Sequence, residues 1–269
     1  MTGLAFAADA VASALTTARD AAVRAGVEVR EVSGIEEQAA VIAVLSRIWG
    51  RSPDNPPVPP ELLRAFGKAG NYIAAAFDGD EIVGAAVGFH STPERHALHS
   101  HIAGVAPSHA GRAVGFAMKL HQRAWALERG IDAVEWTFDP LVARNAYFNI
   151  VKLHAMPIEY LANFYGAMAD TINGGDDTDR LLVRWDLLDP AVAAAAAGVR
   201  EGADAAASDV FVVEVPADIE ALRRTDPVRA RAWRRDVRER LTAQFAAGGG
   251  IVGFERGAGY IVRPGGGAS

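Results

Sequence analysis

Cysteine is absent from the 269-residue chain, which excludes disulfides, cysteine-based metal sites and cysteine nucleophiles. Long apolar runs are also missing, because none approaches the ~20 residues that are needed to cross a bilayer. The formal net charge of -6 argues against a polyanion-binding surface over the whole protein, although a local basic patch is compatible with it. We therefore expect a soluble, cytoplasmic protein with no nucleic-acid partner and no membrane partner.

The N-terminal segment is rich in alanine, yet it lacks the basic start of a signal peptide, and Asp9 interrupts its apolar stretch. Hydrophobic residues make up 50% of the chain, which is enough for one large domain or for a domain with an appendage. We predict a helical extension over residues 1–27 and a main domain over residues 28–188.

Strand-like and helix-like segments alternate along the main domain. Asp78-Gly79-Asp80 joins two apolar runs and predicts a β-hairpin, since glycine supplies a positive φ at no steric cost. A strand over residues 97–105 leads into a long helix from about Ala113 to Arg129, and another strand covers residues 131–138. This alternation predicts a layered α/β fold.

Two helix starts carry capping signals. Ser33 and Glu36 match a Ser-x-x-Glu capping box ahead of an apolar-periodic run. Asp139 followed by Pro140 predicts an N-cap that opens a helix running to about Leu153. Because such a cap stabilises a helix by ~1 kcal/mol, we interpret Asp139 as a cap and not as a catalytic base.

The C-terminal part of the chain differs in composition from the main domain. Residues 189–209 are low in complexity and predict a linker or a weak solvent-facing helix. Residues 210–263 predict a strand–helix–strand extension, in which Asp226 caps a helix that carries Trp233 on one face. This extension has two open roles, completing a pocket or burying a homodimer surface, and we expect residues 264–269 to be disordered.

The most informative segment runs from Gly104 to Lys119, where a strand ends, a turn of small residues follows and an amphipathic helix begins. Small residues let backbone N–H groups approach a ligand closely, and a helix N-terminus adds a partial positive charge. Together they suit a diphosphate. The same small residues also occur at such turns for packing alone.

This segment resembles the acyl-coenzyme A signature of the GNAT superfamily of N-acetyltransferases, in which Arg/Gln-x-x-Gly-x-Gly/Ala follows a strand ending in Val-x-Pro. The matching positions are Ala110, Ala113 and Gly115, and only Gly115 keeps the usual identity. Alanine has replaced both the long side chain and the first glycine. An alanine still exposes its backbone N–H group, so the resemblance predicts that the cradle is retained.

Three further blocks support the resemblance. They are similar to a subgroup of predicted GNAT proteins that share His-Ser-His, Trp-Thr-Phe-Asp-Pro-Leu and Arg-Asn-Ala, here at residues 99–101, 136–141 and 144–146. The likeness covers about residues 28–188. It implies a mixed, mostly antiparallel sheet with two splayed parallel central strands, flanked by helices and followed by a small C-terminal α/β extension.

The resemblance also implies where acetyl-CoA or another acyl-CoA binds as co-substrate. Its arm pairs with the first of the two splayed strands, and a backbone N–H near Val105 stabilises the oxyanion. The expected cofactor-binding residues are Val105, Ala110, Gly111, Arg112, Ala113, Val114, Gly115, Phe116 and Asn145. We expect no metal, because the isolated histidines lack ligand-type spacing.

Catalysis needs a base for the attacking amine, and His101 and His99 are the candidates. They share one face of their strand and titrate near neutrality, although hydrogen-bonded core histidines are an equal alternative. Glu135 is a weaker candidate, since a charge in mid-strand more often faces solvent. The tyrosine that many GNAT enzymes use as acid corresponds to Ile150, so that role is vacant unless Asn149 replaces it.

Other residues keep two interpretations. Arg112, Lys119 and Arg123 can meet coenzyme A phosphates or remain solvated on a helix face. Trp49 can line the acceptor pocket or belong to the core, and Tyr147 is either a substitute acid or a packing aromatic.

The sequence therefore predicts an acyl-CoA-dependent N-acyltransferase that acts on the amine of a small molecule, such as an amino acid or a derivative, by direct attack in a ternary complex. The alternative is a degenerate GNAT domain that binds acyl-CoA or a protein partner without catalysis.

Overall fold

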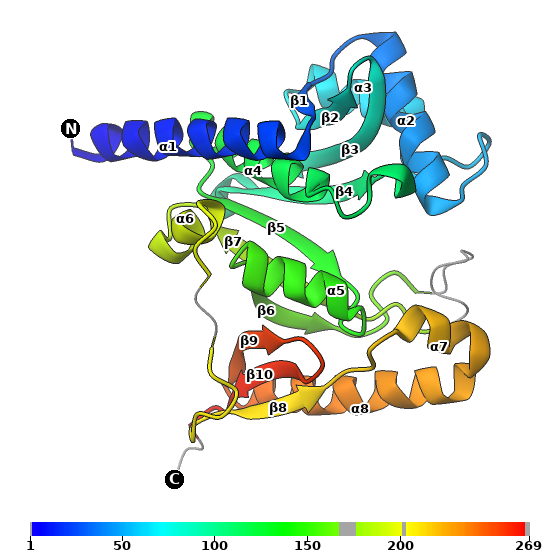
Figure 1. The fold of residues 1–269 in the computed structure, drawn as a ribbon, viewed down its shortest axis with the longest axis vertical. Helices are drawn as coiled ribbons and strands as arrows, with labels where there is room; N and C mark the ends of the chain where they lie inside the picture. Colours follow the sequence, from blue (N-terminus) through cyan, green and yellow to red (C-terminus); the bar gives the residue numbers. More distant parts are fainter. Residues whose placement is uncertain (1, 167–175, 201–202, 267–269) are drawn as a thin grey trace. The chain divides into compact units, whose positions relative to one another are not determined.

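A computed structural model describes residues 2–166, 176–200 and 203–266 (Figure 1). The chain divides into two compact units, Met1–Val134 and Glu135–Ser269, and each unit is described on its own. Within the described ranges, no helix is both long enough and apolar enough to span a bilayer.

The elements of the first unit alternate as expected. In chain order they are α1 (Thr2–Ala25), β1 (Glu28–Glu31), α2 (Ile35–Trp49), α3 (Pro60–Lys68), β2 (Ile73–Asp78), β3 (Glu81–His90), the 3₁₀ turn Pro93–Arg95, β4 (Ala97–Val105), the 3₁₀ turn Pro107–His109 and α4 (Val114–Glu128). The strands β1, β2, β3 and β4 pair in that order, and each pair is antiparallel. The predicted hairpin is confirmed, with Gly79 at φ 60° in its turn.

The sheet of the first unit has a core on each face, as the alternation of side chains along a strand requires. One face packs Ile73, Ala75 and Phe77 against Val41 and other apolar residues of α2. The other face packs against α4. There, Met118 of α4 lies so close to β3 that a Cβ on Gly84 would come within 2.8 Å of its sulfur atom.

The N-terminal helix α1 lies along α4 (Figure 1). Its buried face consists of Ala14, Ala18, Ala21 and Ala25, which recur every three or four residues. Side chains this small let two helices approach closely.

The capping box at the start of α2 is displaced by one residue from its predicted place. The N-cap is Gly34, which has no side chain to accept a hydrogen bond, so the prediction of Ser33 as cap is wrong. Glu37, three residues after Gly34, supplies the second half of the box instead. The hydrogen bond from Arg30 is the main cause that holds the pKa of Glu37 below its usual value, and weaker backbone hydrogen bonds from Ser33 and Gly34 add to it.

The second unit contains the rest of the elements. They are β5 (Ala133–Phe138, which starts in the first unit), α5 (Ala143–Ala146), the π-helical segment Tyr147–Lys152, β6 (Met156–Leu161), β7 (Arg180–Asp186), α6 (Pro190–Ala196), β8 (Phe211–Glu214), α7 (Ile219–Thr225), α8 (Pro227–Ala246), β9 (Gly250–Glu255) and β10 (Gly259–Arg263). β7 lies between β5 and β6, and β10 lies between β8 and β9. Trp185 of β7 is fully buried and packs edge-on against Trp136 of β5 at 5.9 Å.

The predicted α/β class with mostly antiparallel strand pairing is confirmed, since β6–β7, β8–β10 and β9–β10 are antiparallel as well. The predicted splay concerns β4 and β5, which belong to different units, and it stays a prediction. In the stretch predicted as a linker, Asp189 caps α6, and Val192 and Ala195 are buried, so this part is neither a linker nor solvent-facing. Of the predicted disordered tail, residues 267–269 lie outside the described part.

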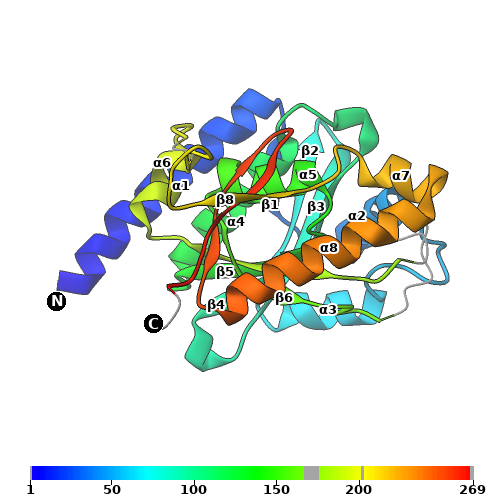
Figure 2. The ribbon, with the colours of Figure 1, turned by 90° about the horizontal axis from the view of Figure 1, so that it is seen from below.

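The C-terminal extension follows the prediction more closely. Asp226 caps α8 by accepting a hydrogen bond from the N–H of Arg229, and Pro227 occupies the first helical position. α8 packs against β6, β8 and β9 (Figure 2). Val237 and Leu241 are fully buried on its inward face.

Asp139 does not cap a helix, and this prediction is wrong. The helix begins only at Ala143, and its N-cap Val142 has no side-chain hydrogen bond. The Asp139 carboxylate accepts a hydrogen bond from the N–H of Leu141 at 3.0 Å, which makes a local turn. The carboxylate also accepts hydrogen bonds from two arginines, because the side chain is buried and a buried charge needs partners.

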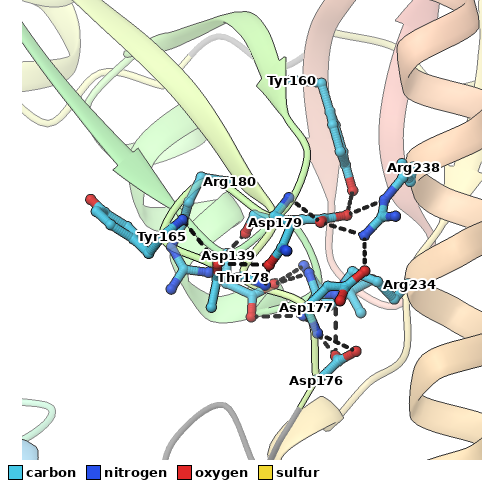
Figure 3. A network of polar contacts seen from close by, with 12 residues as sticks. Asp139, Tyr160, Tyr165, Asp176, Asp177, Thr178, Asp179, Arg180, Arg234 and Arg238 are labelled. Carbon is cyan, nitrogen blue, oxygen red and sulfur yellow. Dashed lines mark hydrogen bonds and ion pairs between the residues drawn. The ribbon is translucent and has the colours of Figure 1, made fainter. Parts of the chain in front are cut away.

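These arginines belong to a buried ionic network (Figure 3). Arg234 of α8 donates to Asp139 Oδ1 at 2.8 Å and to Asp176 Oδ2 at 3.0 Å, and only 1% of Arg234 is exposed. Arg223 of α7 donates to Asp139 Oδ2 at 2.5 Å. Nearby, Arg238 donates to both carboxylate oxygens of Asp179, at 2.6 and 2.8 Å. The network joins the extension to the ends of β5 and β7.

We predict that Arg234→Met lowers the free energy of unfolding by about 3–5 kcal/mol, because it leaves two buried carboxylates with too little positive charge. Urea unfolding followed by circular dichroism measures this loss. Arg235→Met on the same helix is the matched control, since Arg235 is exposed. A loss below about 0.5 kcal/mol for Arg234→Met, equal to that of a surface change, would contradict the prediction.

Candidate functional site

The turn between β4 and α4 has the backbone shape of an anion cradle. Gly111 has φ 83° and Ala113 has φ 63°, both in the left-handed region, and α4 starts at the next residue. Ala113 is the N-cap, but its methyl side chain makes no capping hydrogen bond. Since the first N–H groups of a helix have no partner inside the helix, those of Val114 and Gly115 point away from its end toward any ligand there.

The backbone conformation of Ala113 indicates which residue type this position prefers. A left-handed conformation costs an alanine about 1–2 kcal/mol relative to glycine. The position therefore favours the glycine of the family motif on backbone grounds. Ala110, in contrast, is extended with φ -60° and ψ 140°, so its backbone does not require glycine. The cradle keeps its shape with alanine at both positions.

A polar brace holds the turn against the β2–β3 hairpin. Asp78 Oδ2 lies 3.0 Å from His109 Nε2 and 3.1 Å from the Arg112 guanidinium. His109 is buried, and its Nδ1 lies 2.9 Å from Ser108 Oγ. The hydrogen bonds from His109 and then from Arg112 hold the pKa of Asp78 below its usual value. Arg112 is therefore placed at the cradle, with part of its charge balanced by Asp78.

At the end of β4, one backbone N–H group points away from β3. Ala106 donates its N–H to Val83 of β3 at 2.8 Å, and Val105 pairs with Gly84. Because successive N–H groups of an antiparallel strand point to opposite sides, the N–H of Val105 points away from β3. Trp49 lies beside it, since a Cβ on Gly104 would come within 2.5 Å of the indole ring. This position requires glycine.

His99 and His101 lie on the same face of β4, as predicted. The β3–β4 register passes from Val87 opposite Ile102 to Gly88 opposite Ser100, so His101 is the extra residue of a β-bulge. Bulges re-aim side chains and are frequent beside active sites. The Phe89 ring lies 4.9 Å from the His99 ring and 5.7 Å from the His101 ring, between ring centroids.

His101 has the properties of a general base. It is exposed on the strand face, while partial burial lowers its pKa from the ordinary value. A lowered pKa keeps the imidazole neutral near pH 7, which is the form that accepts a proton. His99 is half-buried beside the same phenylalanine and is the second candidate.

The opposite face of β4 carries a buried polar cluster. Lys119 Nζ donates to Ser100 Oγ at 2.9 Å and to Gln122 Oε1 at 3.0 Å. Burial lowers the pKa of Lys119 to about 7. Both interpretations of Lys119 and Arg123 are corrected here, because the two side chains are buried and neither lies on a solvated helix face. Only Arg112 of the three cations lies at the cradle turn.

The predicted residues after β5 belong to the second unit. Asn145 is half-buried on α5. Asn149 is buried, and its side-chain oxygen accepts a hydrogen bond from the Trp136 indole at 3.3 Å. The side-chain oxygen of Asn149 is therefore used in a hydrogen bond within the core. Ile150, at the position of the family's tyrosine acid, is also buried, with 3% exposed.

Three other residues that the sequence analysis considered have structural partners. Glu135 is buried and pairs with Arg184 at 2.9 Å, so the expectation that it faces solvent is wrong. The guanidinium of Arg256 lies over the Tyr147 ring at 3.8 Å, which agrees with a packing role. For Asp139, burial alone would raise the pKa, but the charges and hydrogen bonds of two arginines hold it at about 2. A carboxylate this acidic cannot act as a base near neutrality.

Sequence reasoning missed two residues of the site. Phe89 faces both histidines from β3, and the hairpin register would have found it, since Phe89 is opposite His99. Asp78 was assigned only to the hairpin turn. Its contact with His109 and Arg112 depends on the path of residues 106–113, which no local pattern specifies.

Residues 40–148 match the sequence profile of the Acetyltransferase (GNAT) family. Among curated protein sequences, none matches the chain. Among solved structures, a GNAT-family protein from Desulfovibrio desulfuricans is 16% identical, with a TM-score of 0.50 over 60% of this chain and 99% of its own. An N-acetyltransferase from Staphylococcus aureus Mu50 is 14% identical, with a TM-score of 0.49 over 60% of this chain and 98% of its own.

The protein yncA from Salmonella typhimurium, solved with acetyl-CoA, is 15% identical, with a TM-score of 0.48 over 61% of this chain and 95% of its own. At such identities, structural likeness concerns the fold alone, and the family assignment rests on the sequence profile. Over residues 40–148, the chain is thus similar to the GNAT acetyltransferase family.

Proposed function

We propose that the protein is an acyl-CoA-dependent N-acyltransferase that transfers an acetyl group to the amine of a small molecule. The observation that carries this proposal is the turn from Gly111 to Gly115, where left-handed residues and an uncapped helix start present N–H groups to an anion. The diphosphate of coenzyme A is the anion that fits the family profile. Arg112 adds a positive charge to the same turn.

In the proposed reaction, the amine nitrogen attacks the thioester carbonyl while acyl-CoA and amine are both bound. The N–H of Val105 donates to the carbonyl oxygen and stabilises the negative charge that develops there. His101, directly or through water, takes the proton that the nitrogen must lose. The C–S bond then breaks, and the coenzyme A thiolate leaves with a proton taken from solvent, because the position of the family's tyrosine holds Ile150.

The proposal extends to the acceptor amine and to the contact with acyl-CoA. Trp49, Phe89 and the two histidines give the acceptor side of β4 an aromatic surface. An amino acid or an amino-acid derivative is the proposed acceptor class. Asn145 is proposed to contact the pantetheine arm, as in the family pattern. We place the protein in the cytoplasm, where acetyl-CoA is available.

A second candidate function is an acyl-CoA-binding module without catalysis. Ile150 favours it, because a buried isoleucine cannot protonate a leaving thiolate. The exposed His101 and its lowered pKa favour the enzyme, since a binding module needs no base.

We predict that acetyl-CoA binds and raises the melting temperature. At 100 times its dissociation constant, a ligand stabilises the folded state by ~2.7 kcal/mol. Thermal shift with acetyl-CoA, succinyl-CoA and free coenzyme A measures this, and thiol release across a panel of amines measures transfer. If no coenzyme A species shifts the melting temperature, both functions are wrong; binding without transfer to any amine supports the second.

We predict that His101→Gln lowers kcat by about 10²-fold or more while acetyl-CoA binding is unchanged. In the wild type, kcat/KM should rise with pH as His101 loses its proton and level off below pH ~6.5, where an ordinary histidine titrates, because burial lowers this pKa. The control is His96→Asn, at an exposed position whose positive φ suits asparagine. Turnover equal to wild type in His101→Gln would exclude His101 as the base.

We predict that Ala113→Gly raises the free energy of unfolding by up to about 1 kcal/mol and does not weaken acetyl-CoA binding. Glycine removes about 1–2 kcal/mol of left-handed strain and adds a smaller entropy cost. Urea unfolding and calorimetry are the measurements. Ala106→Gly is the matched control, because Ala106 has φ -56° and should be destabilised by about 0.5–1 kcal/mol. Equal losses in both variants would disprove strain at Ala113.

A further inference from the structure

The segment between β5 and β6 is held by the C-terminal extension at successive points. Asp139 accepts hydrogen bonds from Arg223 of α7 and Arg234 of α8. One residue later, the carbonyl oxygen of Pro140 accepts a hydrogen bond from the buried hydroxyl of Tyr260 of β10 at 2.6 Å. Every one of these groups lies in the second unit.

The tethers continue into the helix that carries Asn145. Arg144 forms a bidentate ion pair with Glu220 of α7, in which Nη2 lies 2.7 Å from Oε1. Tyr147 stacks under the guanidinium of Arg256, which lies in the turn between β9 and β10. Asn145 is therefore flanked on both sides by residues that the extension holds.

The local sequence alone does not specify this conformation. α5 has four residues, and its N-cap Val142 makes no side-chain hydrogen bond. A helix this short is unstable by itself in water, and the π-helical turns after it have weaker geometry than an α-helix. The extension has its own caps, because Asp218 and Asp226 accept hydrogen bonds from the first turns of α7 and α8. The starts of α7 and α8 are thus specified by their own caps, whereas α5 depends on its contacts with the extension.

The contacts between the extension and residues 139–147 differ in burial. This difference distinguishes contacts that stabilise the fold from contacts that orient α5. The Asp139 network is buried, so its loss changes stability. The Arg144–Glu220 pair lies near the surface, with 67% and 31% of the side chains exposed. Exposed pairs contribute little to folding free energy. A bidentate pair still fixes the orientation of the helix to which it is attached.

We infer that the C-terminal extension positions α5 for acyl-CoA, and that Glu220 is the positioning residue that sets the orientation of Asn145 through Arg144. This inference rests on the proposed function, in which Asn145 contacts the pantetheine arm. It gives the extension a role in the acyl-CoA site that does not require residues 210–263 to contact the ligand.

The experiment is a charge swap in the full-length chain. Glu220→Arg and Arg144→Glu should each raise the Kd for acetyl-CoA about fivefold or more, which is the lower range of coupling between distant sites. The double variant, which restores the pair in reverse, should return to within about twofold of wild type. At saturating acetyl-CoA, kcat should change less than Kd. Glu239→Arg on α8 is the matched control, because Glu239 is exposed.

Amide hydrogen exchange measures how firmly residues 140–147 are held, and it needs no bound ligand. In Glu220→Arg, residues 140–147 should exchange faster while α8 keeps its protection. Unchanged exchange in this segment would overturn the inference, even if the wild type binds no acyl-CoA and the proposed function fails. A lower melting temperature with unchanged Kd, or failure of the double variant to recover, would also overturn it and leave the extension a purely structural role.

Discussion

The second unit depends on one constraint, that a carboxylate removed from water must be surrounded by positive charge and hydrogen-bond donors. Asp139 meets it with Arg223, Arg234 and the N–H of Leu141. Two of these donors come from helices more than eighty residues later in the chain. The end of β5 therefore cannot reach its folded environment until the extension has folded. Stability and the local shape of residues 139–147 are linked for this reason, and the extension is an integral part of the unit.

In the first unit, the polar groups at the start of α4 are left without such partners. At the start of α4 no side chain caps the helix, so the N–H groups of Val114 and Gly115 are left for the external anion that we propose. The surrounding groups are arranged to keep the turn in this state. Asp78 binds His109 and Arg112, both of which belong to the turn, so it fixes the loop and does not reach forward to cap the helix. In the second unit, the buried charge of Asp139 is satisfied by arginines of the same unit, whereas in the first unit the start of α4 has no side-chain cap. The arrangement in the first unit is typical of a binding site.

Much of this could be predicted from the sequence, because local signals determine it. The Asp-Gly hairpin, the strand over residues 97–105 and the Asp226 cap each depend on a few neighbouring residues. The predictions failed where a distant partner decides. Asp139 has the pattern of an N-cap, but arginines of α7 and α8 take its carboxylate. Lys119 and Arg123 have the spacing of a solvated face, yet α4 is covered on one side by the sheet and on another by α1. The β-bulge at His101 was also invisible, since the strand pattern is the same with or without an extra residue.

The departures from the family motif are weaker evidence for a degenerate domain than they look in the sequence. The family motif specifies residue identities, whereas the groups of the proposed anion cradle are backbone N–H groups. Ala113 keeps the left-handed conformation that glycine adopts freely, although this conformation is unfavourable for alanine. Strain of this kind persists only where the surroundings determine the conformation. Here the brace through Asp78 and His109 on one side and the start of α4 on the other do so. With alanine in place of glycine, the turn therefore keeps the backbone conformation on which the proposed anion site depends. The vacancy at Ile150 concerns only the leaving thiolate, which can take its proton from solvent, as in the proposed reaction.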